Sequence, residues 1–180
     1  MASAVMEAPV RERIEPAWDL VDGVLVERDM GNLADFYATR LLSHLSPYVD
    51  RERLGVTQAM SAGYQYPALD HGRLRVPDLS FVRRDKLKDG LPAEGWADYP
   101  PDLVVEAVSR NDNAESVHHK SQVWLDGGVR LVWVLYPKER QIVVHHPDRT
   151  SRTYSVGEEI TGEDVVPGFS VPLAAIFADP

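Results

Sequence analysis

Cysteine is absent from this 180-residue chain, which excludes disulfides, zinc–thiolate sites and thiol catalysis. A chain without cysteine also suits a reducing compartment, so we expect a cytoplasmic protein. Positive charge is scarce, because 19 Lys and Arg residues face 28 Asp and Glu residues and leave a formal net charge of −9. Proteins that coat nucleic acid without specificity depend on Lys and Arg. The bulk charge therefore argues against that class, although it leaves room for a local basic groove.

Long apolar runs are missing as well. The opening MASAVMEAPVRERIEP has neither a positive leader before an apolar stretch nor a span of membrane length, so we expect no signal peptide and no membrane anchor. We interpret residues 1–15 as a flexible tail. The chain is 44% hydrophobic, which is enough for one core, and no repeat or linker divides it. Residues 16–180 are therefore predicted to form a single domain.

Turn signals and hydrophobic periodicity predict the first elements. Asp-Gly at 22–23 joins two short apolar runs, which predicts a hairpin over Trp18–Glu27. An amphipathic helix follows, with Asn32 as its cap and a stripe at three- and four-residue steps: Leu33, Phe36, Tyr37, Arg40, Leu41, Leu45 and Val49. Residues 55–66 and 73–87 are then predicted as strands, and residues 86–101, rich in Pro, Gly and acid, as a long surface loop.

The second half alternates strand and helix patterns. DLVVEAVS, residues 102–109, is almost continuously apolar and predicts a central strand covered on both faces. Cap residues and two glycines frame a helix within residues 111–128. Two strands joined by a hairpin and one short strand follow, and FSVPLAAIF is expected to pack on the body. This order predicts an α/β (α+β mixed) fold with a mixed sheet flanked by helices.

The predicted strand at residues 73–87, RLRVPDLSFVRRDKL, has an unusual centre. Pro77 cannot donate to a sheet ladder, and Asp78 is costly to bury without a partner. A local bulge or distortion that turns the Asp78 carboxylate outward would account for both residues.

Glu106 lies within the apolar strand of residues 102–109, where a carboxylate needs a partner or a cation. Asp102 shares its face, but four residues of strand separate the two by about 13 Å, so we interpret Asp102 as a strand-start residue. Neighbouring strands lie only about 4.8 Å apart. If the strands of Asp78 and Glu106 pair, the two carboxylates can reach one hard cation such as Mg²⁺.

Lys120 lies on the border of the apolar stripe of the second helix, which comprises Ala114, Val117, Ser121, Trp124 and Leu125. It can point along the protein body and position a water or offset phosphate charge, or it can simply extend along apolar surface. Adjacent histidines do not converge on one ligand on a helix or a strand. We therefore predict no metal site at His118–His119 or at His145–His146.

Basic residues flank the strand that carries Pro77 and Asp78. We take four of them, Arg73, Arg75, Arg83 and Arg84, as candidate nucleic-acid contacts, together with Arg110 after the strand of residues 102–109. The alternative is that they form a solvated edge, which is the commoner role of a charge run.

The motifs RVPDLSFV, PDLVVEAVS and HHKSQVWLDGGVRLVWVLYP, in this order, resemble the Uma-two family of bacterial restriction-endonuclease-like proteins. WDLVDGVLV near the start and VPGFSVPLAAIF near the end match as well. The resemblance implies a PD-(D/E)xK nuclease-like fold and a phosphodiesterase site that uses Mg²⁺ or Mn²⁺. It makes Asp78 and Glu106 the metal carboxylates and Asp19 an accessory acid at a position where the family usually has glutamate.

One position departs from the superfamily pattern. The usual lysine two residues after the glutamate is replaced by Val108. Members of the family supply this lysine from the following helix, and Lys120 matches that place.

Three functions compete. The first is a metal-dependent nuclease acting on nucleic acid, with DNA as the expected partner. The second is a binding or regulatory module that keeps the fold without catalysis, as a homodimer; the net charge and Val108 favour it. The third is a glycoside or ester hydrolase that uses Asp78 and Glu106 as acid and base without a metal.

Overall fold

The computed structural model describes residues 18–21, 24–27, 32–87, 90–109 and 112–179. The predicted tail at residues 1–15, the Asp-Gly turn and Arg110 lie outside these ranges.

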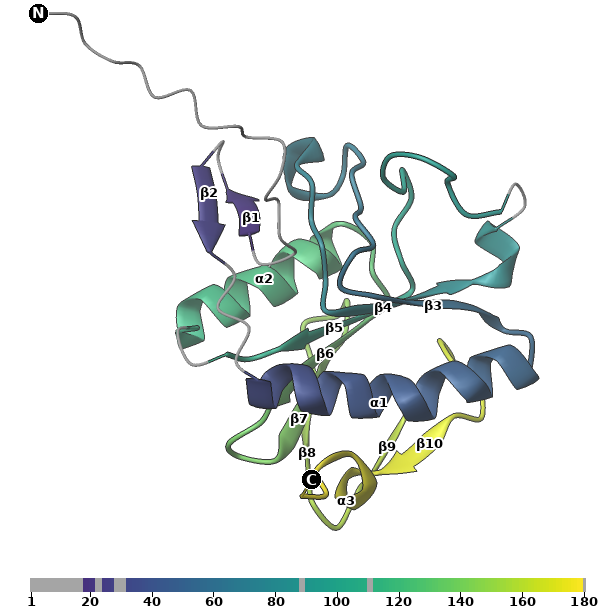
Figure 1. Ribbon diagram of the computed structural model, residues 1–180, viewed down its shortest axis with the longest axis vertical. Coiled ribbons are helices and arrows are strands. Elements are labelled where there is room, and N and C mark those ends of the chain that lie inside the picture. The colour runs from purple at the N-terminus through teal and green to yellow at the C-terminus, as the bar shows by residue number, and fades with distance from the viewer. Residues whose placement is uncertain (1–17, 22–23, 28–31, 88–89, 110–111, 180) are drawn as a thin grey trace, which may run out of the picture.

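Strands β1 (Trp18–Val21) and β2 (Val24–Glu27) pair antiparallel as a separate two-stranded sheet, which confirms the predicted hairpin (Figure 1).

Six strands form the central sheet in the order β3-β4-β5-β6-β7-β8. Their bounds are Gly55–Ala59, Leu79–Arg83, Leu103–Ala107, Leu131–Tyr136, Gln141–His145 and Ser151–Ser155. Only β5 and β6 run parallel, and the other neighbours are antiparallel. The predicted mixed sheet is therefore confirmed, including the β6–β7 hairpin and the buried central strand β5.

Helices cover both faces of this sheet (Figure 1). The helix α1 (Asn32–Arg51) packs on the face formed by alternate residues such as Phe81 and Val105, and α2 (Ala114–Asp126) packs on the face formed by Val82 and Val104. We call these the α1 face and the α2 face. Asn113 caps α2 through a reciprocal hydrogen-bonded box with Ser116, so the predicted helix is confirmed at both ends.

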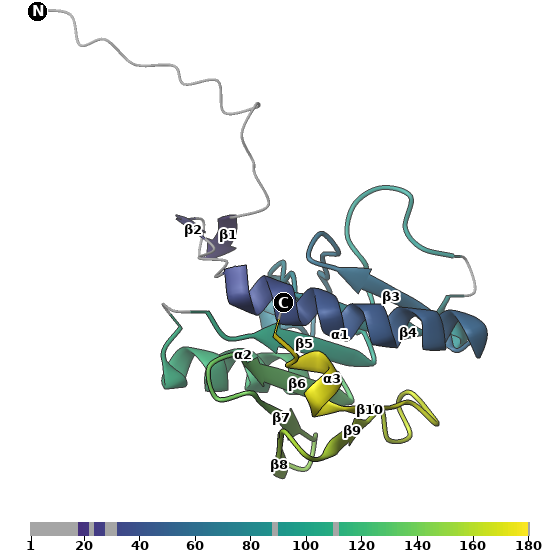
Figure 2. The same cartoon turned by 60° about the horizontal axis from the view of Figure 1, so that its bottom comes forward.

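The end of the chain adds a small subsheet that the sequence did not predict. Strands β9 (Glu159–Thr161) and β10 (Ser170–Pro172) pair antiparallel, and the short helix α3 (Leu173–Ile176) follows. Figure 2 shows α3 beside α1. Phe169, Leu173 and Phe177 are buried in the core of the α1 face, as expected for the apolar closing segment.

Two predicted apolar stripes are wrong at one position each. Leu33 is 45% exposed in the first turn of α1, and the stripe that faces the sheet uses Ala34 and Ala38 instead. Ala114 is exposed in the first turn of α2. Both residues lie at helix ends, where they line a cleft and not the core.

The strand predicted over residues 73–87 is shorter than expected. Strand β4 begins at Leu79, so Pro77 and Asp78 precede the strand instead of interrupting it. Because the ladder starts after Pro77, its missing N–H costs no sheet hydrogen bond. Upstream, Arg75 forms only an isolated bridge to Tyr64, and strand β3 ends at Ala59, well short of Tyr66.

Candidate active site

The register of β4 and β5 brings Asp78 beside Glu106. Leu79 pairs with Val105 and Ser80 with Val104, so extending this register by one residue places Asp78 opposite Glu106. Residues opposite each other in an antiparallel pair have Cα atoms about 4.5–5.5 Å apart. A hydrogen bond of 2.7 Å from the backbone N–H of Ala107 to Asp78 Oδ2 holds the carboxylate against β5.

Both carboxylates belong to the α2 face. Strand side chains alternate between faces, and Glu106 follows Val104, which is buried in the α2-face core. By the same alternation Asp78 lies on the side of Ser80 and Val82. The two acids therefore come from the residue just before β4 and from the adjacent strand β5. They share one face, which is the juxtaposition that joint coordination of an ion requires.

Trp124 orients Glu106. Its indole N–H donates a 2.7 Å hydrogen bond to Glu106 Oε1, and its side chain is buried in the α2-face core. The ring packs edge-on against Tyr64 at 6.1 Å between centroids, and the Tyr64 hydroxyl donates to Ser80 at 2.7 Å. Desolvation raises the pKa of Tyr64, so the phenol that packs against Trp124 stays neutral.

Lys120 lies close to the carboxylates. Burial by itself lowers the pKa of Lys120, but the charges of Glu106, Asp112 and Asp78 together with a hydrogen bond to Asp112 outweigh burial and raise it. The Nζ atom is 3.2 Å from Asp112 Oδ1. Lys120 is therefore held protonated on the side of α2 that faces the two acids.

Asp112 anchors Lys120 and was missed by the sequence analysis, which treated it as part of the helix cap. Its Oδ2 accepts hydrogen bonds of 2.9 Å from the backbone N–H and from the hydroxyl of Ser109. Desolvation raises the pKa of Asp112, but the Ser109 hydrogen bonds and the Lys120 charge prevail and lower it. Asp112 thus stays ionised, and the spacing of Ser109 and Asp112 before the helix was the available signal.

The remaining predicted residues lie elsewhere. Asp102 is 1% exposed; it accepts a 2.9 Å hydrogen bond from the Arg83 N–H and an ion pair from Lys86 at 3.0 Å, which makes it a structural residue. Arg75 pairs with Asp70 and Arg83 with Asp85. Arg73 and Arg84 are exposed, and the Arg84 guanidinium reaches the Arg53 carbonyl at 3.5 Å.

Asp19 lies in β1, where its backbone pairs with Val26; its side chain is outside the described part of the chain. Within the described ranges no three His, Cys, Asp or Glu side chains cluster so as to hold a metal ion. The pair of Asp78 and Glu106 still fits Mg²⁺, because this ion is commonly held by one or two carboxylates and keeps several waters. Hard oxygen donors of this kind suit Mg²⁺ or Mn²⁺.

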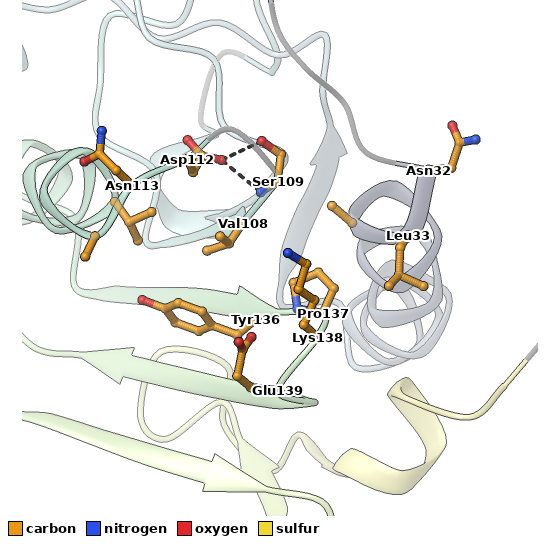
Figure 3. Close-up of a pocket in the computed structure, with 13 residues that line it drawn as sticks. Asn32, Leu33, Val108, Ser109, Asp112, Asn113, Tyr136, Pro137, Lys138 and Glu139 are labelled. Atoms are coloured by element: carbon orange, nitrogen blue, oxygen red, sulfur yellow. Dashed lines mark hydrogen bonds between the residues drawn. The ribbon is translucent and has the colours of Figure 1, made fainter.

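A cleft of about 710 Å³ opens next to Asp112. Figure 3 shows its wall of Val108, Ser109 and Asp112 on one side. On the other side lie Tyr136, at the end of β6, and Lys138 and Glu139 of the β6–β7 turn. Leu33 of α1 and Val117 of α2 complete the lining. The cleft therefore lies at the carboxyl ends of the parallel strands β5 and β6, where open α/β sheets commonly bind ligands.

Similarity to known proteins gives the family and the fold of the chain. No curated protein matches it. Its fold is similar to the crystal structure of a "putative nuclease belonging to DUF820" from Anabaena variabilis, with a TM-score of 0.77 and 15% sequence identity over 91% of this chain and 90% of that one.

In the described part of the chain, no helix combines the length and apolar character needed to span a bilayer.

The model of the family Uma2, described as "Putative restriction endonuclease", matches residues 6–174. The chain therefore belongs to the Uma2 family, and its mixed sheet with flanking helices is a nuclease-like fold.

Proposed function

We propose that this protein is a Mg²⁺-dependent endonuclease that hydrolyses phosphodiester bonds in nucleic acid, with DNA as the expected substrate and the cytoplasm as its compartment. The observation that carries the proposal is the convergence of Asp78 and Glu106 on the α2 face, with Lys120 in electrostatic contact with both. Membership of the Uma2 family supports the same reaction class.

In this proposal Asp78 and Glu106 hold the metal, each oriented by a hydrogen bond to one of its oxygens. When bound, Mg²⁺ supplies Lewis-acid polarisation of the phosphate and a bound water of lowered pKa. Pre-oriented ligands lower the cost of assembling such a site. The Ala107 N–H and the Trp124 indole are thus the supports of the two metal carboxylates.

Lys120 acts as a cation in this mechanism. Because neighbouring carboxylates raise its pKa, it is not available as a general base near neutral pH. Its ammonium instead donates hydrogen bonds to a phosphate oxygen or to the attacking water and offsets negative charge that develops in the transition state. The α2 helix thereby supplies the charge that the residue at position 108, a valine here, does not.

Cleavage assays on supercoiled plasmid, single-stranded DNA and RNA with Mg²⁺, with Mn²⁺ and with excess EDTA test this proposal. We expect Glu106→Gln, Asp78→Asn and Lys120→Met each to reduce cleavage by about 100-fold or more. Glu115→Gln is the matched control, because Glu115 is exposed in the first turn of the same helix. Cleavage that survives EDTA, or that is unchanged in Glu106→Gln, would contradict the assignment.

A second candidate is a non-catalytic module of the same fold that works as a homodimer. The net charge of −9 and Val108 favour it, since both weaken interaction with a phosphate backbone. Thermal unfolding with and without Mg²⁺ separates the two functions. A stabilisation by Mg²⁺ that Asp78→Asn removes supports the enzyme, whereas no stabilisation, together with a dimer in light scattering, supports the module.

A further inference from the structure

The cleft beside Asp112 differs from the metal-binding pair in its chemistry. Figure 3 shows the Tyr136 ring and the Val108 side chain from neighbouring strands at the cleft, and Val117 and Leu33 add further apolar surface. Tyr136 is half-buried, so its ring is anchored on the sheet while part of it stays accessible. The cleft therefore offers an aromatic and aliphatic surface to a flat ligand.

The charges around the cleft do not favour an anion. Lys138 and Glu139 are consecutive, exposed and of opposite sign, and Asp112 is compensated by its ion pair with Lys120. A phosphate needs an excess of positive charge or of N–H donors. A neutral ligand with an apolar face and a polar edge suits the side chains of this lining.

The cleft is also close to the proposed metal site. Val108, the residue after β5, continues the face of Glu106 two residues or about 7 Å further on. Tyr136 follows Val134, which pairs with Glu106. Asp112 lines the cleft and holds Lys120, so a group in the cleft is in reach of a phosphate at Asp78 and Glu106.

We propose that this cleft binds one unstacked nucleobase of the substrate, with the Tyr136 ring as its stacking platform, so that the protein prefers single-stranded or locally unpaired nucleic acid. The inference rests on the proposed function, because it names the substrate class of the same site. Bases in a duplex are covered on both faces by their neighbours, and a base enters such a cleft only after leaving the stack. Stacking on an aromatic ring tolerates any base.

Binding is measured apart from cleavage, by fluorescence anisotropy of a labelled single-stranded 12-mer and of its blunt duplex, with Ca²⁺ in place of Mg²⁺. We expect the single strand to bind more tightly. Tyr136→Leu, which keeps an apolar side chain and removes the π-face, is expected to weaken binding of the single strand roughly tenfold. Tyr136→Phe keeps the ring and is expected to stay within about twofold of the wild type.

Salt dependence separates a base from a phosphate as the occupant. Loss of a stacking contact shifts the plot of log Kd against log[salt] without changing its slope, whereas loss of a phosphate contact lowers the slope by about one. Trp96→Leu is the control for an exposed aromatic away from the cleft, since Trp96 is 48% exposed on the loop before β5, and it should leave affinity unchanged. Circular dichroism and the melting temperature verify that every variant is folded.

The outcomes distinguish this inference from the proposed function. Weaker binding in Tyr136→Leu without cleavage by any metal-loaded sample supports the base site and removes the nuclease. Normal cleavage and unchanged binding in Tyr136→Leu, or tighter binding of the duplex, overturns the base site and leaves the nuclease. A wild-type protein that binds neither oligonucleotide overturns the base site as well.

Discussion

The two faces of the central sheet each bury a tryptophan, and the two side chains are used differently. Trp133 of β6 belongs to the core of the α1 face and stacks with Phe169 at 6.3 Å between ring centroids. Its indole N–H is buried without a hydrogen-bond acceptor among the described residues. Trp124 belongs to the α2 face and donates its N–H to Glu106. One ring serves packing alone, and the other also orients a carboxylate.

The buried polar residues follow the same division. Ser80, Asp102 and Ser121 are the buried polar residues of the described chain; Ser121 lies on α2, and Ser80 and Asp102 lie on the α2 face, two residues before Val82 and Val104. Each has a hydrogen-bond partner, as buried polar groups require. The α1 face thus provides stability through apolar burial, while these three partnered polar residues and the candidate site lie on the α2 side of the sheet.

The largest effect on stability is expected from a substitution in the core of the α1 face. Leu41 is fully buried between α1 and the sheet, and Leu41→Ala should lower the free energy of unfolding by about 2–5 kcal/mol through lost burial and the cavity left behind. Urea unfolding measures this loss. The stabilisation that Mg²⁺ gives to the remaining folded protein should be unchanged, and a variant that loses it would show that the two faces are coupled.

Removing the buried carboxylate of Asp102 is expected to have the next largest effect. Asp102→Ala leaves the Arg83 N–H without its acceptor and removes the carboxylate that pairs with the Lys86 ammonium, which should cost about 3 kcal/mol in unfolding free energy. Isothermal titration should give an unchanged Mg²⁺ affinity, because Asp102 is a structural residue of the α2 side. An affinity that falls tenfold would place Asp102 in the metal site.

The two tryptophans provide a matched pair of variants. Trp124→Phe removes the donor to Glu106 and should weaken Mg²⁺ binding by about 10- to 100-fold, the usual cost of losing a group that orients a metal ligand. Trp133→Phe removes an N–H that has no acceptor in the described structure and should leave Mg²⁺ affinity unchanged. Equal losses in both variants, measured by titration calorimetry, would indicate a general packing effect instead of orientation.

The smallest effect concerns the ion pair of Asp112 and Lys120, which is partly exposed. Asp112→Asn should cost about 0.5–1 kcal/mol at pH 7. The folded state lowers the pKa of Asp112, so the carboxylate stabilises the protein above its unfolded pKa of about 3.9. That contribution is lost as the pH falls through the lower, folded value.

Urea unfolding between pH 7 and pH 3 checks the sign of this pH dependence. The difference between the wild type and Asp112→Asn should be present at pH 7 and shrink below about pH 4. Asp164→Asn is the control, because that carboxylate is exposed and pairs with Arg130 on the surface. A difference that grows toward low pH would contradict the role given to Asp112.

Local sequence accounts for most of the elements. The hairpin of β1 and β2, the ends of α2 and the buried strand β5 depend on turn residues, caps and apolar runs, which act over a few neighbouring positions. The same local rules failed where pairing with another strand decides whether a segment is a strand. Strand β4 starts only at Leu79, and β9 and β10 were missed because each has three residues and is defined by its partner.

In the candidate site, too, the sequence determines one part and the tertiary structure another. The sequence alone marked Asp78 and Glu106 as residues in need of partners, since a carboxylate in an apolar strand is costly to bury. It left Lys120 between a role at the site and simple extension along apolar surface. Only the folded chain supplied those partners: Ala107 for Asp78, Trp124 for Glu106 and Asp112 for Lys120. The first two contacts join residues 29 and 18 positions apart. A helical wheel shows which side of α2 faces the protein, but strand register and helix placement choose the atoms that meet there.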